Sequence, residues 1–256
     1  LLLVPMRFHQ EVLGVLAVVN RVDGQPFAPA DLGLLQALAD QASISIYYAG
    51  LRETLEEKMR IDRDLDAARR IQTSLLPKTL PRVEGVELAA FNYPALEIGG
   101  DYYDFIEVDD THLGIAMADV SGKGTGGAIM MSVCRSVIRA HAPRHLSPAQ
   151  VLKLVNQVLA HDVSEDMFVS VLYMVLNTST RELVVARAGH ERPIVSHEQQ
   201  DLTILDSPGV AIGIADTETF ERVLEEIRIP LKPGDVVVAY TDGVTEAMNI
   251  REEEWG

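Results

Sequence analysis

Three aspartates stand where apolar, strand-like segments meet glycines, and they are the residues of this chain best suited to chemistry. They are Asp101, Asp119 and Asp242. Carboxylates at buried strand ends are costly unless a positive group neutralises them. No Arg or Lys recurs beside all three, so a divalent metal ion is the simplest partner. Clusters of oxygen ligands suit hard ions such as Mg²⁺ or Mn²⁺.

The glycine-rich segment 122–127 also matches the nucleotide-binding pattern G-x-G-x-x-G. A dinucleotide fold needs a βαβ unit and an acidic residue about 20 positions further on, but residues 139–143 stand there and a second helix follows. A P-loop needs Ser or Thr after Gly-Lys, whereas Gly124 follows Lys123. Both nucleotide interpretations therefore fail. The glycines are better explained as a tight turn that lets the Val120 carbonyl face a metal.

The composition is typical of an intracellular protein with a sizeable core. The chain has 256 residues, of which 47% are hydrophobic, and at about 150 residues per domain it predicts one to two domains. A net charge of −16 argues against nucleic acid as a partner. The single cysteine, Cys134, excludes an internal disulfide and predicts a buried thiol. No signal peptide and no apolar run long enough for a membrane span is visible, so we expect a cytoplasmic location.

The first third of the chain predicts the end of one domain followed by a long helix. Residues 11–20 read as a strand, and a helix begins near Ala30. Residues 1–5 resemble an interior strand without an initiator Met, so we expect a longer chain. Over 49–77 the faces between the apolar positions are charged. The apolar positions follow helical spacing at Leu51, Leu55, Met59, Ile61, Leu65, Ala68, Ile71 and Leu75.

Two interpretations of this linker helix remain open. It is either a solvated amphipathic helix packed on its neighbours or a parallel coiled coil that joins two chains into a homodimer over 48–75. Its position between two domains favours the coiled coil. The irregular step between Met59 and Ile61 is compatible with a switchable register.

The rest of the chain predicts an α+β domain over 78–256. Strands, then two helices, then strands give a non-alternating order, and we expect two antiparallel sheets facing each other with helices outside. The expected strands are 86–91, 102–108, 113–118, 167–176, 182–186, 193–195 and 236–240, and the expected helices are 124–142 and 147–161.

Six segments, in this order, resemble the motifs of the bacterial PP2C-like (PPM) Ser/Thr phosphatases of the SpoIIE/RsbU type. They read ARRIQTSLLP at 68–77, GGDYYD at 99–104, DVSGKG at 119–124, AGH at 188–190, LKPGD at 231–235 and YTDGVTE at 240–246. Residues 1–51 are similar to the C-terminal end of a GAF sensory domain. The resemblance implies a PP2C-like β-sandwich of two antiparallel sheets flanked by helices. A GAF fragment (1–48) and a long linker helix (49–77) precede it.

The resemblance further implies a metal-dependent phosphoserine/phosphothreonine protein phosphatase with two Mn²⁺ or Mg²⁺ ions. Asp119 would bridge both ions, Asp101 and the Val120 carbonyl would bind one, and Asp242 the other. A metal-activated water would attack phosphorus. The implied substrate is a phosphorylated STAS-domain anti-sigma-factor antagonist, dephosphorylated under the control of the upstream sensor domain.

Two departures from the family pattern bear on activity. The family's domain continues with a helix, a last strand and an Asp-Asp pair whose aspartate completes one metal site, whereas this sequence ends at Gly256. Either that segment is deleted, which would leave the metal site beside Asp242 short of a ligand, or it lies beyond this sequence. Arg187 stands where the family more often has Asn. The alternative function is a catalytically inactive phosphatase-like scaffold or regulatory dimerisation module, which the missing aspartate supports. The three intact aspartates oppose it.

Several other residues have two interpretations each. His190 either positions a phosphate or a neighbouring carboxylate, or is a structural histidine in a turn. Asp104 is expected to hydrogen-bond within its own turn, and Glu246 either caps the helix start after Asp242 or orients a metal-bound water. Lys123 either meets a phosphate or is exposed. The histidines expected at the surface are His141, His145 and His161.

Overall fold

A computed structural model describes residues 1–93, 98–122, 124–164, 166–197, 201–251 and 253–254. Lys123 lies outside these residues. The chain divides into two compact units, Leu1–Leu65 and Asp66–Gly256, which are described separately. The three-part functional division into 1–48, 49–77 and 78–256 stays a prediction.

The first unit contains a hairpin and most of one long helix. Strands β1 (Leu2–Phe8) and β2 (Glu11–Val18) pair antiparallel. Helix α1 (Pro29–Leu75) begins with proline, whose fixed φ suits the first helical turn, and its residues up to Leu65 belong to this unit. A small core joins hairpin and helix through Val4, Met6, Leu35 and Ala39. The predicted strand and helix are therefore present.

Helix α1 is continuous from Pro29 to Leu75. The helix expected to begin near Ala30 and the linker helix expected over 49–77 are therefore parts of one helix. It ends at Leu75, two residues before Pro77, as expected because the residue before a proline is disfavoured in the helical region. None of the helices in the described ranges is long and apolar enough to cross a membrane.

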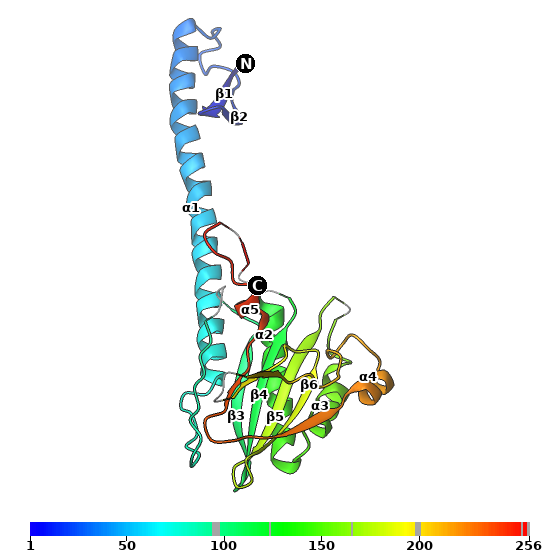
Figure 1. The fold of residues 1–256 in the computed structure, drawn as a ribbon. Helices are drawn as coiled ribbons and strands as arrows, with labels where there is room; N and C mark the ends of the chain where they lie inside the picture. The colour runs from blue at the N-terminus through cyan, green and yellow to red at the C-terminus, as the bar shows by residue number, and fades with distance from the viewer. Residues whose placement is uncertain (94–97, 123, 165, 198–200, 252, 255–256) are drawn as a thin grey trace. The chain divides into compact units, whose positions relative to one another are not determined.

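Two antiparallel sheets form the second unit (Figure 1). The larger has the order β3-β4-β5-β6-β9, and the smaller has the order β10-β7-β8. The strands of the larger sheet are β3 (Tyr102–Asp109), β4 (His112–Val120), β5 (Val169–Asn177), β6 (Glu182–Ala188) and β9 (Glu226–Pro230). Those of the smaller are β7 (Ile194–Ser196), β8 (Leu202–Ile204) and β10 (Val236–Val238).

Two apolar cores separate three layers of the second unit. One core lies between the larger sheet and its helices, and includes Met131, Ile138, Leu152 and Tyr173. The other joins the two sheets through residues such as Met174 on β5 and Val195 on β7. The helices are α2 (Thr125–His141), the short 3-10 helix η1 (Ala142–Arg144), α3 (Pro148–Leu159), α4 (Thr217–Val223) and α5 (Asp242–Thr245). This arrangement confirms the predicted α+β sandwich.

Two local predictions were wrong or incomplete. Residues 86–91 form no strand, and only a single bridge joins Val83 and Val86. Val86 and Leu88 satisfy their apolar character by packing against the core between the sheets without a ladder of hydrogen bonds. Strand β9 was missed because it is an edge strand in which charged and apolar residues alternate.

Candidate metal centre

The antiparallel pairing of β3 and β4 brings Asp101 beside Asp119. Tyr102 lies opposite Ala118, so the residue before β3 falls next to the residue after Ala118. The two carboxyl groups lie close enough to shift the pKa of each other. Asp101 directly precedes β3, as the expected strand over 102–108 implies, and it lies at the sheet edge that Asp119 shares.

Asp242 reaches the same place from a distant part of the chain. It is the first residue of α5 and is exposed. The hydroxyl of Thr241 donates a hydrogen bond of 3.4 Å to Asp101 Oδ2. The negative charge of Asp242 raises the pKa of both Asp101 and Asp119. The structure thus places the three aspartates singled out by the sequence near enough for their charges to interact.

The three aspartates of this site carry negative charge that no basic side chain of the described ranges neutralises. Burial, followed by the charges of Asp101 and Asp242, raises the pKa of Asp119 to about 7. Burial first, and then Asp242, raises the pKa of Asp101. None of the ion pairs within the described ranges includes any of the three. A divalent cation would relieve this repulsion.

Gly100 keeps the space between the carboxylates and the Val120 backbone open. A Cβ at position 100 would lie 2.6 Å from the Val120 carbonyl oxygen and 3.2 Å from Asp119 Oδ1. The Val120 N–H also hydrogen-bonds the Asp119 carboxylate and lowers its pKa. A carbonyl oxygen and a carboxylate therefore border one small space that only glycine leaves free.

The ligand chemistry of this site fits a hard divalent cation, although its side chains do not form a closed cage. Over the described ranges, no group of three or more His, Cys, Asp or Glu side chains is arranged as a ready metal site. Asp101 and Asp119 are partly buried next to each other, while Asp242 is exposed. All of the donors are oxygens, as Mg²⁺ and Mn²⁺ prefer.

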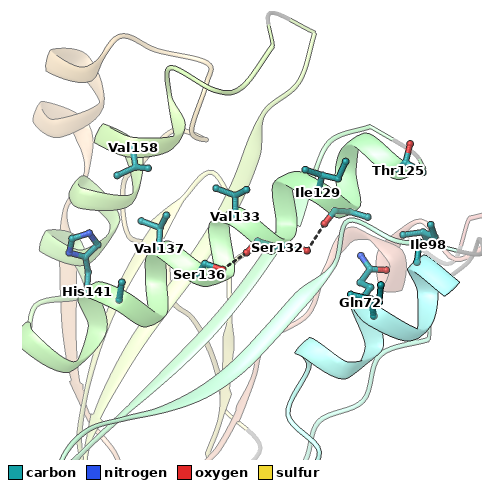
Figure 2. A pocket seen from close by; sticks show the side chains of 14 residues that line it. Gln72, Ile98, Thr125, Ile129, Ser132, Val133, Ser136, Val137, His141 and Val158 are labelled. Carbon is teal, nitrogen blue, oxygen red and sulfur yellow. Dashed lines mark hydrogen bonds between the residues drawn. The ribbon is translucent and has the colours of Figure 1, made fainter.

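Gln72, near the end of α1, contacts the backbone just before Asp101, which sequence reasoning missed. Its side-chain amide donates to the Gly99 carbonyl, and its Oε1 accepts from the Gly99 N–H at 3.3 Å. Figure 2 shows Gln72 beside Ile98, next to a groove of about 680 Å³ that the exposed face of α2 also lines. In the sequence, the polar Gln72 stands among the apolar positions Ala68, Ile71 and Leu75, and this break in the pattern could have indicated the contact.

Two of the secondary predictions need correction. Asp104 lies in β3 rather than in a turn, is buried, and accepts hydrogen bonds from the Tyr102 hydroxyl (2.7 Å) and Arg139 Nε (2.8 Å). It therefore anchors α2 to the sheet. Glu246 does not cap the start of α5, because it follows the last residue of the helix and its N–H donates to the Asp242 carbonyl.

The remaining candidates differ in burial. Cys134 is buried, and burial raises the pKa of its thiol to about 12, as expected for a structural cysteine. His161 is exposed, while His141 and His145 are half-buried. His190 is 3% exposed.

The sequence profile of the family described as "Stage II sporulation protein E (SpoIIE)" matches residues 109–256, more than half of the chain. The chain belongs to the SpoIIE family. The GAF domain profile matches residues 1–46, in line with the predicted GAF fragment. The SpoIIE match includes Asp119, Val120 and Asp242, whereas Asp101 precedes it.

Relatives of this SpoIIE-family chain include named phosphatases. It is 33% identical over 194 residues to phosphoserine phosphatase RsbU of Bacillus subtilis. The alignment covers 74% of this chain and 55% of RsbU. It is 27% identical over 220 residues to protein IcfG of Synechocystis, covering 75% of this chain and 34% of IcfG. The chain thus spans between about a third and just over half of these relatives.

A solved structure supports the fold of this SpoIIE-family chain. The SiaA-PP2C domain of Pseudomonas aeruginosa superimposes with a TM-score of 0.61 at 22% identity, covering 78% of this chain and 79% of that domain. At this identity the likeness shows the fold alone. The PP2C-like sandwich expected from the sequence is therefore confirmed.

Proposed function

We propose that this SpoIIE-family chain is a metal-dependent phosphoserine/phosphothreonine protein phosphatase. The observation that carries the proposal is the placing of Asp101 and Asp119 at one sheet edge, with Asp242 at the start of α5 near enough for its charge to act on both. No basic side chain of the described ranges forms an ion pair with them. The relationship to phosphoserine phosphatase RsbU supports the reaction class.

In this proposal, two Mn²⁺ or Mg²⁺ ions would be held by Asp119, by Asp101 with the Val120 carbonyl, and by Asp242. Such ions, when bound, supply positive charge for a phosphoryl group and lower the pKa of water. The chain's own contribution is to orient these oxygens. The Val120 N–H holds the Asp119 carboxylate, and the Thr241 hydroxyl holds Asp101.

The substrate that we propose is a phosphoserine or phosphothreonine on a folded protein, namely a STAS-domain anti-sigma-factor antagonist in the cytoplasm. A protein-borne phosphate needs a site at the surface, and Asp242 is exposed. Phe168 is 40% exposed, and its backbone is hydrogen-bonded to Ser121, next to Val120. An apolar side chain close to the proposed ligands suits contact with the substrate protein.

For regulation, we propose that the GAF-like part (1–48) controls the phosphatase part (78–256) through the linker (49–77). Gln72 offers the contact for this control, because its amide hydrogen-bonds both polar groups of Gly99. Arg135 of α2 adds a second contact, donating from Nε to the Leu75 carbonyl at 2.8 Å. A rotation of the last turns of α1 would therefore displace the backbone that leads into Asp101.

We also propose that α1 forms a parallel homodimer. Ile44, Tyr48, Leu51 and Leu55 are all exposed and follow one another at spacings of four, three and four residues. That spacing is the a/d pattern of a two-stranded coiled coil. Exposed apolar side chains in such a row bury their surface when a second helix packs against them.

The test of the proposed function is Mn²⁺-dependent phosphate release from a phosphoserine-bearing STAS-domain protein. The Asp119→Asn variant should lose this activity. The matched control is Asp109→Asn, because Asp109 is an exposed aspartate at the other end of β3 and its variant should stay active. Full activity of Asp119→Asn would refute the assignment. Mn²⁺ binding by the wild type without turnover of any phosphoserine protein would instead favour the scaffold.

A further inference from the structure

His190 is buried directly behind the candidate metal centre and is held there by a turn that only glycine permits. It follows β6 and is 3% exposed. The preceding Gly189 has φ 68°, and a Cβ there would lie 2.5 Å from the Ala211 backbone nitrogen. The turn is therefore packed against a neighbouring backbone, which leaves the histidine ring little freedom to move.

On one side, the ring is connected to the strand end that carries Asp119. His190 Nδ1 lies 2.9 Å from the Ser170 hydroxyl. Ser170 pairs with Asp119 in the β4–β5 ladder, and its hydroxyl is 3.3 Å from the Asp119 carbonyl oxygen. A serine inside the apolar strand β5 thus links the ring to the backbone of a proposed metal ligand.

On its other side, the ring faces the segment that carries Asp242. The Tyr240 backbone lies near enough to raise the pKa of the ring, and the buried Nε2 has no hydrogen-bond partner among the described residues. Tyr240 precedes Thr241, whose hydroxyl reaches Asp101, and Asp242 comes next. The ring therefore lies between two parts of the chain. One is the β4–β5 strand pair with Ser170 and its partner Asp119, and the other holds Tyr240 and Asp242.

The surroundings of His190 favour a neutral ring in a fixed orientation. Burial first, and then the nearby Arg187 charge, lowers the pKa of His190 to about 4. A neutral imidazole has one donor and one acceptor nitrogen, and either can pair with the Ser170 hydroxyl that faces Nδ1. Arg187 also donates from Nη1 to the His190 carbonyl at 2.8 Å and from Nη2 to Asp206 at 2.9 Å. Arg187 therefore ties the turn at Gly189 and His190 to Asp206.

We propose that His190 is a positioning residue of the metal centre that holds segment 240–242 in register with the strand end of Asp119, acting through Ser170. His190 makes no hydrogen bond to the carboxylates of Asp101, Asp119 or Asp242. Its contribution is to set the separation between Asp119 and Asp242, which must suit a divalent ion that both residues would hold. This inference rests on the proposed function, because it needs these aspartates to be metal ligands.

Two conservative variants separate the two sides of the ring. His190→Asn keeps a polar atom near the place of Nδ1, facing Ser170. His190→Gln keeps one near the place of Nε2, facing Tyr240. Substitution of residues that orient metal ligands typically weakens metal binding roughly 10–100-fold. We expect such a loss of Mn²⁺ affinity for His190→Ala, a smaller loss for each conservative variant, and a loss for Ser170→Ala.

The measurement is isothermal titration of the metal-free full chain with Mn²⁺, together with the Mn²⁺ dependence of phosphate release. Because the histidine positions ligands, the variants should need more Mn²⁺ for half-maximal activity while kcat at saturating Mn²⁺ is largely restored. Ile138→Val is the control for lost packing, since Ile138 is fully buried in α2 and belongs to the core between the helices and the larger sheet. It should lower the Tm without changing Mn²⁺ affinity.

Unchanged Mn²⁺ affinity in folded His190→Asn, His190→Gln and Ser170→Ala would overturn the inference and leave the proposed function intact. An equal loss of affinity in Ile138→Val would also overturn it, because the effect would then be one of general stability. Failure of the wild type to bind Mn²⁺ would refute the proposed function, and the inference would fall with it. If His190→Ala does not fold, the three milder variants carry the test.

Discussion

Replacing Gly100 by alanine tests whether the space beside Asp119 is needed for metal binding. The added Cβ would lie 2.6 Å from the Val120 carbonyl oxygen, 3.2 Å from the Val120 nitrogen and 3.2 Å from Asp119 Oδ1. Two of these are backbone atoms, which cannot rotate away. The Val120 carbonyl would have to move by about 0.4 Å before the contact reached 3.0 Å. Overpacking of this kind costs about 1–3 kcal/mol of the free energy of unfolding.

The same displacement moves a proposed ligand oxygen. We therefore expect Gly100→Ala to be folded but less stable in urea, and to bind Mn²⁺ roughly 10–100-fold more weakly, as when ligand orientation is disturbed. Denaturation of the metal-free chain and Mn²⁺ titration measure the two effects separately. Gly126→Ala is the matched control. Gly126 lies in the first turn of α2 with nothing within 4 Å of its added Cβ, so alanine should stabilise the helix by about 0.5–1 kcal/mol.

The reasoning would be refuted if Gly100→Ala bound Mn²⁺ as tightly as the wild type while Gly126→Ala behaved as described. In that case neither the Val120 carbonyl nor the position of the Asp119 carboxylate would limit metal binding. Equal destabilisation by both glycine substitutions would refute the steric argument itself.

Three further predictions follow. His190 has a pKa near 4 in the folded state against about 6.5 unfolded; its stabilisation is therefore complete above pH 6.5 and is lost as pH falls towards 4. Relative to His190→Gln, the metal-free wild type should lose on the order of 3 kcal/mol over that range, and parallel urea-denaturation profiles of the two would contradict this. Replacing Leu51 and Leu55 together by glutamate should give monomers in light scattering, because it charges the exposed apolar row of α1; dimers that persist would exclude the coiled coil. Gln72→Ala should lower phosphatase activity without changing the site's own residues, because it removes both hydrogen bonds to Gly99; activity equal to that of the wild type would remove Gln72 from the control route.

The sequence could predict the neighbouring positions of Asp101 and Asp119 because strand ends are visible as breaks in apolar runs. Antiparallel pairing of neighbouring strands then puts such ends at one edge of a sheet, as Asp101 and Asp119 show. The pattern could not predict the contact of His190 with Ser170, since it joins a residue of β5 to one that follows β6, 20 positions along the chain, and depends on the β5–β6 register.

Failures of the secondary-structure prediction have the same origin. Residues 86–91 have the apolar content of a strand but pack against a core without pairing along a ladder. Strand β9 forms because it pairs with β6 at the sheet edge. Glu226 and Arg228 interrupt the apolar residues of this segment, so the sequence pattern did not indicate a strand. In both places long-range pairing decides the structure, and a local pattern does not contain it.

The measurement that tests the central claim most directly is the initial rate of phosphate release from a phosphoserine protein as a function of Mn²⁺ concentration. Wild type and Asp119→Asn should be compared, each with and without a chelator. We predict release by the wild type that saturates with Mn²⁺, stops on chelation and is absent in Asp119→Asn. Release that persists in the chelator, or that Asp119→Asn retains in full, would contradict a metal-dependent phosphatase at this site.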